Sequence, residues 1–137
     1  MAQPSVTLIN ATLAAAVSAD VTAGVFAMPS GRVEALTLLA KFVRAGGGTT
    51  TQAWVQTSFD GGTTWMDVAT FAFTTTTATR LFNLTAAAVT SIATPTDGSL
   101  TDNTCVNGFL GDLFRVKLTT VGTYTGASSL TIVALPK

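Results

Sequence analysis

Histidine is absent from this 137-residue chain, and cysteine occurs only once, at Cys105. Without histidine the chain cannot assemble a Ser-His-Asp or Cys-His catalytic group, nor the histidine-containing zinc sites that are common in proteins. A single cysteine cannot form a disulfide within the chain. We therefore expect no catalytic residues, no metal site and no cofactor, and we predict that the protein is not an enzyme.

Charge is also scarce. Charged residues make up 10% of the chain, seven basic and seven acidic, whereas about 25% is typical. A neutral chain of this kind has no basic face that would release counterions from a nucleic acid. No stretch reaches the roughly 18 consecutive apolar residues of a membrane-spanning helix. The sequence therefore predicts neither a nucleic-acid partner nor a membrane partner.

Threonine and alanine, by contrast, are abundant, with 27 and 21 residues, and apolar side chains recur with a period of two from residue 33 onward. This alternation is typical of half-buried strands. In the strand expected at residues 65–73 it places Trp65, Ala69, Phe71 and Phe73 on one face. The pattern predicts strands over residues 33–43, 52–59, 65–73, 80–84 and 113–120, and a last one marked by Leu130, Ile132 and Ala134.

Between these strands the sequence carries turn formers. Gly46-Gly47-Gly48 is expected to be a flexible connection, and residues 86–107 a long surface loop, because Pro95 and Asp97-Gly98 interrupt any regular element. The only helical candidate is residues 11–19. Several short strands separated by turns predict an all-β fold, an antiparallel β-sandwich or small barrel.

The first 26 residues differ from the rest, since they are apolar, rich in small residues and without a strong period. Residues 1–19 carry no charged side chain and end in small residues, as a secretory signal does before its cleavage site. The first four residues contain no Lys or Arg, however, so we expect no cleaved leader. We predict an extended N-terminal arm over residues 1–26 and a β-domain over residues 27–137. Too many apolar side chains lie on this arm for a solvated tail, so we expect it to contact a neighbouring subunit. The candidate assembly residues are Val6, Leu8, Ile9, Leu13 and Val17.

The sharpest local motif lies at residues 58–65, SFDGGTTW, which matches S-x-D-x-G-x-T-W. This pattern is the Asp-box of sialidases and other β-propeller proteins, where it is structural. Asp60 can accept hydrogen bonds from backbone N–H groups across the turn, and Gly61 and Gly62 permit positive φ. We therefore predict a structural hairpin rather than a glycosidase site. Its residues are Ser58, Asp60, Gly62, Thr64 and Trp65.

Two longer blocks carry a further resemblance. Residues 52–57 (QAWVQT) run into the Asp-box and on to residues 66–73, and residues 111–124 read GDLFRVKLTTVGTY. Together they resemble small structural virion proteins of tailed bacteriophages. This resemblance implies a virion location, with assembly in the host cytoplasm, and binding to the major capsid protein or another virion protein.

The function expected from these observations is that of a capsid decoration, or cement, protein that stabilises the head shell as a homo-oligomer, with a trimer favoured at three-fold junctions. A tail, head-completion or spike component is the alternative within the same class. A carbohydrate-binding module, with exposed Trp54 or Trp65 as a sugar platform, is the alternative from another class. Burial of both indoles would weaken that last hypothesis.

Overall fold

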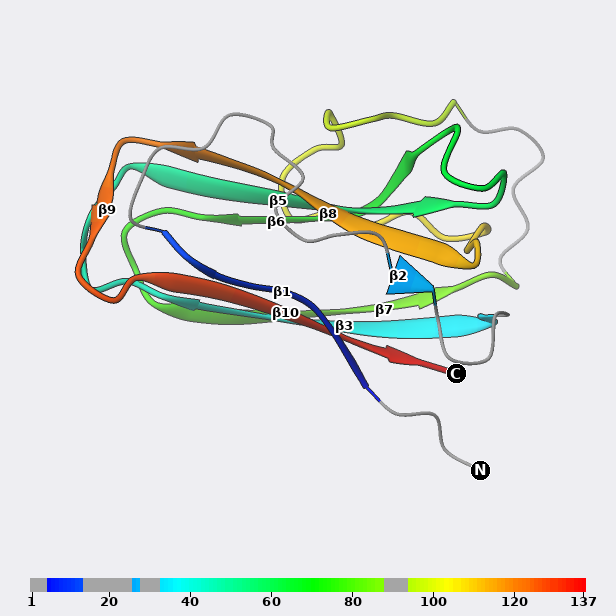
Figure 1. Ribbon diagram of the computed structural model, residues 1–137, viewed down its shortest axis with the longest axis horizontal. Coiled ribbons are helices and arrows are strands. Elements are labelled where there is room, and N and C mark those ends of the chain that lie inside the picture. The colour runs from blue at the N-terminus through cyan, green and yellow to red at the C-terminus, as the bar shows by residue number, and fades with distance from the viewer. Residues whose placement is uncertain (1–4, 14–25, 28–32, 88–93) are drawn as a thin grey trace.

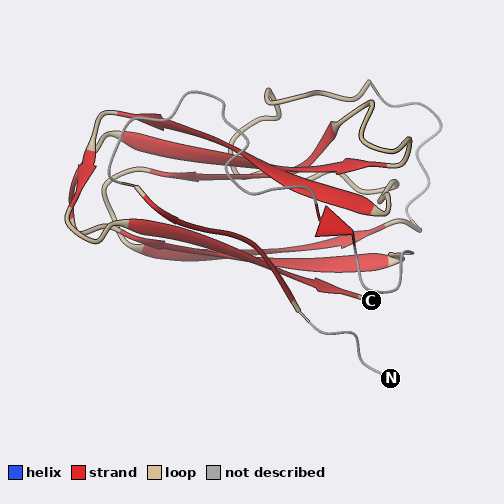
Figure 2. Ribbon diagram, viewed as in Figure 1, coloured by secondary structure: helices blue, strands red, loops and turns tan. Residues whose placement is uncertain are grey.

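The computed structural model describes residues 5–13, 26–27, 33–87 and 94–137. Strands whose side chains alternate between the two faces form two antiparallel layers. All regular elements within these ranges are strands (Figure 2). Each layer is an open sheet of four strands, and the two sheets lie face to face (Figure 1). The predicted all-β fold is therefore confirmed, as a sandwich rather than a closed barrel.

The first sheet has the strand order β1-β10-β3-β7, and the second has the order β2-β8-β5-β6. A two-stranded pair, β4-β9, lies at one end of the sandwich (Figure 1). The strands are β1 (Val6–Thr12), β2 (Phe26–Ala27), β3 (Ala35–Val43), β4 (Gly46–Gly47), β5 (Thr50–Ser58), β6 (Met66–Phe73), β7 (Ala78–Thr85), β8 (Leu113–Val121), β9 (Tyr124–Thr125) and β10 (Ser129–Pro136).

The core lies between the inner faces of the two sheets. Side chains from β3 and β10 face those of β5 and β8, and most are fully buried. Phe42 stacks on Phe73 with ring centroids 5.0 Å apart and meets Tyr124 edge-on at 5.6 Å. The Tyr124 hydroxyl donates to the Thr74 carbonyl at 2.7 Å, so this buried polar tip is satisfied.

The glycine run at residues 46–48 is ordered by this aromatic cluster. Gly46 and Gly47 form β4, and Gly48 has a φ of +72°. A Cβ atom at Gly48 would lie 2.3 Å from the Tyr124 ring. The expected flexible connection is thus a short strand, and glycine is required where the backbone passes the tyrosine.

The N-terminal segment corrects one prediction. Strand β1 pairs with β10 of its own sheet, from Val6 opposite Ala134 to Thr12 opposite Ser129. Leu8, Ile9 and Leu13 are 0%, 4% and 2% exposed in the core, and Val6 packs against it. The buried Leu8, Ile9 and Leu13 side chains contact their own sandwich, which does not support their predicted contact with a neighbouring subunit. Val6 is only half-buried, and its contact with a neighbouring subunit stays a prediction. Val17 lies outside the described residues, as does most of the helical candidate, whose first two residues belong to β1.

A bulge in β6 corrects a second prediction. Val55 pairs with Ala69 and Gln56 with Asp67, so Val68 has no opposite residue. The extra residue shifts the alternation. Val68, Ala69, Phe71 and Phe73 all belong to the core, whereas Trp65 lies under Arg115 on the outer side of the second sheet. Trp65 therefore does not share a face with the phenylalanines.

Candidate functional site

The hairpin between β5 and β6 is closed by side-chain hydrogen bonds of the Asp-box motif. The Ser58 hydroxyl donates to Asp60 Oδ1 at 2.9 Å and accepts from the Gly62 N–H at 3.0 Å. The Thr64 N–H donates to the same Asp60 oxygen at 2.8 Å. Gly61 and Gly62 have φ values of +73° and +89°. These contacts match the structural hairpin that the sequence predicts.

Trp65 forms the floor of this hairpin. Its indole is 9% exposed and lies within van der Waals distance of Gly62, where an added Cβ would be 3.6 Å from the ring. On the other side, the Arg115 guanidinium lies 4.3 Å from the ring centroid, a cation–π geometry. The hairpin tip is thus rigidly attached to the second sheet, and it presents Phe59 with 63% of the side chain exposed.

The pKa of Asp60 is lowered, first by the backbone hydrogen bond from Thr64 and then by the hydroxyls of Thr64 and Ser58. A carboxyl whose folded pKa lies below its unfolded value stabilises the fold above the unfolded pKa, near 3.8. This contribution is lost as the pH falls through the folded pKa.

We expect Asp60→Ala to lower the melting temperature by a few degrees at neutral pH. The difference in melting temperature from wild type should close at strongly acidic pH. Thermal melts by circular dichroism test this, with Asp112→Ala as an exposed-carboxylate control; a gap that persists unchanged below the folded pKa would contradict it.

A buried carboxylate beside the hairpin organises the long loop that follows β7. Asp67 is 1% exposed, and Gln56 Nε2 donates to it at 2.8 Å. The Thr96 hydroxyl and the N–H groups of three successive residues, Gly98, Ser99 and Leu100, also donate to this carboxylate, at 2.8–3.1 Å. Both oxygens of Asp67 accept hydrogen bonds from protein donors, so this carboxylate holds the loop against β6.

Gln56 joins this carboxylate to a second one at the surface. Its Nε2 also donates to Asp97 at 2.6 Å, and its Oε1 accepts from Arg115 Nε at 2.7 Å. Lys117 Nζ lies 3.1 Å from Asp97. Burial acts to raise the pKa of Asp97, but the hydrogen bonds from Gln56 and Lys117 and the charges of Lys117 and Arg115 together lower it. The network is fully paired, which favours a role in holding the loop and the sheet together.

The loop also covers the other tryptophan. The Trp54 indole N–H donates to the Leu100 carbonyl at 3.4 Å, and the side chain is 7% exposed. Along the free edge of β6, the Thr70 N–H donates to the Thr104 carbonyl and the Val106 N–H to the Val68 carbonyl. Neither Trp54 nor Trp65 therefore offers an open ring face as a sugar platform.

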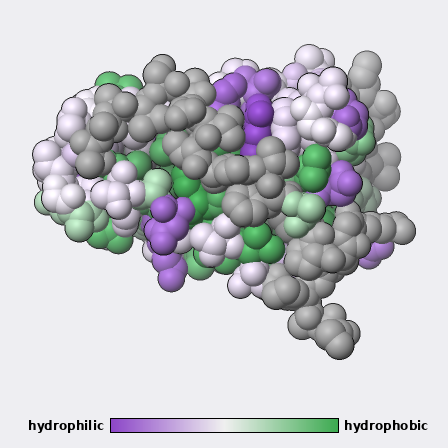
Figure 3. Space-filling view, in the orientation of Figure 1, coloured by the Kyte–Doolittle hydropathy of each residue, from purple (hydrophilic) through white to green (hydrophobic). Residues whose placement is uncertain are grey.

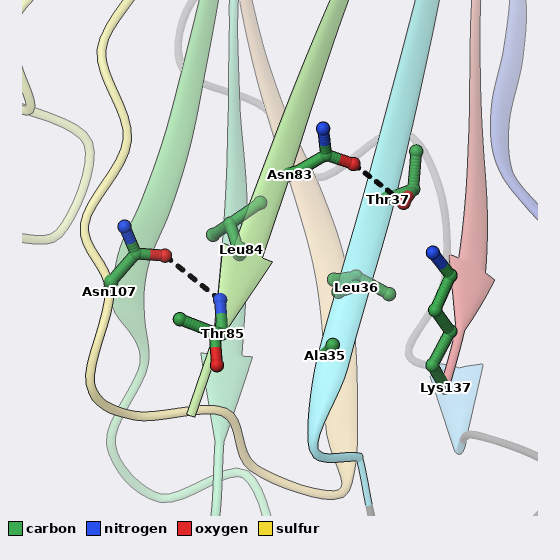
Figure 4. Close-up of a pocket in the computed structure, with 8 residues that line it drawn as sticks. All are labelled: Ala35, Leu36, Thr37, Asn83, Leu84, Thr85, Asn107 and Lys137. Carbon is green, nitrogen blue, oxygen red and sulfur yellow. Dashed lines mark hydrogen bonds between the residues drawn. The ribbon is translucent and has the colours of Figure 1, made fainter. Parts of the chain in front are cut away.

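The hollow drawn in Figure 4, of about 420 Å³, lies where β3 begins and β7 ends. The Thr37 hydroxyl donates to Asn83 Oδ1 at 2.8 Å, and the Thr85 N–H donates to Asn107 Oδ1 at 2.9 Å. These bonds use the amide oxygens of Asn83 and Asn107, whereas Figure 4 draws no bond from the two amide nitrogens or from Lys137 Nζ. In the part of the chain that the structure describes, no group of three or more His, Cys, Asp or Glu side chains could hold a metal ion.

The sequence does not single out the outer face of the first sheet, which carries several exposed aliphatic side chains. Strand alternation turns five aliphatic side chains outward, and Leu81 is 54%, Val43 48% and Leu135 39% exposed. We call Leu39, Val43, Leu81, Val133 and Leu135 the outer aliphatic face. Among the outward positions of these four described strands, Lys41 is the one charged residue.

Polar side chains on this face bond to each other rather than standing free. The Thr131 hydroxyl donates to Asn10 Oδ1 at 3.1 Å, and Thr37 is paired with Asn83. Figure 3 views the sandwich from the side rather than onto this face, and there the hydrophilic residues form separate patches. A sheet face with so little charge has the composition of the central part of a protein–protein interface.

Comparison of the chain with protein-family models, with curated proteins and with solved structures finds no match. Helices are absent from the described ranges, and none therefore has the length and apolar character needed to cross a membrane.

Proposed function

We propose that the protein is a structural component of a bacteriophage virion, a decoration or cement protein that binds the head shell. The observation that supports this most is the outer aliphatic face, which lies on a four-stranded sheet whose described outward positions include one charged residue, Lys41. Exposed apolar surface of this kind is typical of a contact with another protein. Residues 52–73 and 111–124 resemble small virion proteins, which implies that the partner is the major capsid protein or another virion protein.

The size of the face fits a protein that acts in many copies. Four strands about 4.8 Å apart and about 27 Å long give an area on the order of 500 Å². A standard stable interface buries roughly 800 Å² on each partner. One such contact is weak, but repetition over a shell, and pairing within a trimer, raise the overall affinity without new contacts.

The alternative within the same class is a tail, head-completion or spike component, which would use the same face on a different partner. Copy number separates the two. Mass spectrometry of purified virions of the phage that encodes the chain should give hundreds of copies per particle for a shell protein. Six or twelve copies would overturn the decoration role in favour of the neck or tail, and absence from the particle would overturn the virion role.

Placing a charge on the outer aliphatic face should strongly weaken attachment to the particle. We expect Leu81→Lys to reduce the occupancy of purified particles at least tenfold, because a lysine there must be desolvated against the partner. The matched control is Val121→Lys at the end of β8, since Val121 is also 54% exposed but lies on the second sheet. Co-sedimentation with particles measures both, and equal binding by the two variants would contradict the assignment of this face.

A further inference from the structure

A second cavity, of about 240 Å³, lies where the edge strands of the two sheets, β6 and β7, approach each other. Its wall includes Arg80 from β7, Gln52 from β5, and Asp102 and Asn103 from the long loop. Proteins bind drug-sized ligands in cavities of roughly 300–1,000 Å³. This cavity therefore suits a single small ring.

Arg80 supplies an unpaired cation to this cavity. Its guanidinium lies 5.2 Å from the centroid of the Phe73 ring, which is itself stacked on Phe42. Within the described part of the chain, Arg80 forms no ion pair and donates no hydrogen bond. The aromatic ring thus positions a planar group whose N–H donors are all available, and a guanidinium fits a carboxylate with two parallel hydrogen bonds.

Three other polar residues of the wall, Gln52, Asp102 and Asn103, offer both acceptors and a donor. Gln52 Nε2 donates to Asp102 Oδ1, and Asn103 Oδ1 accepts from the Ala72 N–H at 3.0 Å. These bonds fix the three side chains against the sheet. They leave Asp102 Oδ2, Gln52 Oε1 and the Asn103 amide nitrogen without a partner among the described residues.

One polar atom in the same wall is unusual. Thr51 is fully buried, lines the cavity, and its hydroxyl has no hydrogen-bond partner in the described structure. Buried hydroxyls are nearly always bonded, but this one is closed off from the surface, so the ligand contacts below do not include it.

We propose that this cavity binds a sugar acid, a single pyranose ring that carries a carboxylate. Arg80 binds the carboxylate, while Asp102, Gln52 and Asn103 bind the ring hydroxyls. Arg80 and Asp102 both line the cavity without forming an ion pair with each other, so a ligand can contact the cation and the carboxylate separately. A phosphate dianion fits less well, because it brings a second negative charge into a cavity lined by Asp102 and leaves the hydroxyl-binding groups unused.

The test is a titration of the full chain with D-glucuronate. Calorimetry measures the affinity, and NMR monitors the side-chain amides of Gln52 and Asn103. D-glucose, which has a hydroxymethyl group in place of the carboxylate, and acetate, which lacks the ring, are the matched ligands. We expect each to bind at least tenfold more weakly than glucuronate, because each loses one half of the contacts.

Arg80→Gln should weaken glucuronate binding by about ten- to a hundredfold, and Lys41→Gln, the same charge change on the outer side of the first sheet, should leave it unchanged. If Arg80→Gln does not fold by circular dichroism, Arg80→Lys replaces it and should weaken binding roughly tenfold through loss of the two-pronged contact. No binding at millimolar glucuronate, equal binding of acetate or glucose, or equal loss in the Lys41 variant would each overturn the proposal. These outcomes are independent of particle attachment.

Discussion

Replacing Leu8 by alanine is expected to lower the free energy of unfolding by about 2–5 kcal/mol. Leu8 is completely buried, on a strand that pairs along its length with β10. Removing most of its side chain loses the transfer free energy of three carbons and leaves a cavity between the sheets. Urea denaturation followed by circular dichroism measures the change.

The neighbouring residue provides the control. Thr7 is exposed on the other side of β1, so Thr7→Ala should change stability by no more than about 0.5 kcal/mol. The same pair of variants decides between two roles for the N-terminal segment. If the segment contacted a neighbouring subunit, Leu8→Ala would leave the stability of the isolated chain unchanged and would reduce only assembly.

Much of the sandwich could be predicted because its strands obey the simple alternation of a sheet with one buried face. The strand predicted at residues 113–120 is observed as β8 (Leu113–Val121), and that at residues 33–43 as β3 (Ala35–Val43). The Asp-box hairpin is equally local. Its four hydrogen-bonding groups lie within seven residues, so the sequence contains all of the information that the turn needs.

The errors arise where an extra residue interrupts the alternation. In β1 the register shifts between Thr7 and Ile9, so that Leu8 and Ile9 both point inward. This bulge removes the period that identifies a strand, which is why the sequence predicts an arm there. The bulge at Val68 has the same effect in β6, where it moves Trp65 to the opposite face from Phe71 and Phe73.

Long-range contacts could not be predicted either. The cavity at Arg80 combines side chains from β5, β7 and the long loop, and the Arg80 and Asp102 positions are 22 residues apart in sequence. One signal was available for the buried network: Gln56 and Asp67 are polar residues inside predicted strands, at positions where an apolar side chain would be expected. Polar residues inside a strand point to a buried hydrogen-bond network when they lie near each other across a hairpin.

Asp67 should therefore be among the most sensitive positions in the chain. We expect Asp67→Ala to lower the free energy of unfolding by about 3–5 kcal/mol, because donors from Gln56, Thr96 and the loop backbone lose their acceptor while they remain largely buried. Asp67→Asn preserves the shape but directs an amide N–H₂ group at N–H donors, so it should be nearly as damaging. Asp112→Asn, an exposed carboxylate, should change stability by no more than about 0.5 kcal/mol.

In the Asp67 variants, the loss of structure should begin in the long loop rather than in the sheets. Leu100 both donates its N–H to Asp67 and accepts the indole N–H of Trp54 through its carbonyl. Release of the loop should therefore speed amide hydrogen exchange at Gly98, Ser99 and Leu100 and shift tryptophan emission to the red, since Trp54 becomes hydrated. Exchange that stays slow at these three amides in Asp67→Asn, with emission unchanged, would show that the loop is held by its contacts along the edge of β6 and not by the buried carboxylate.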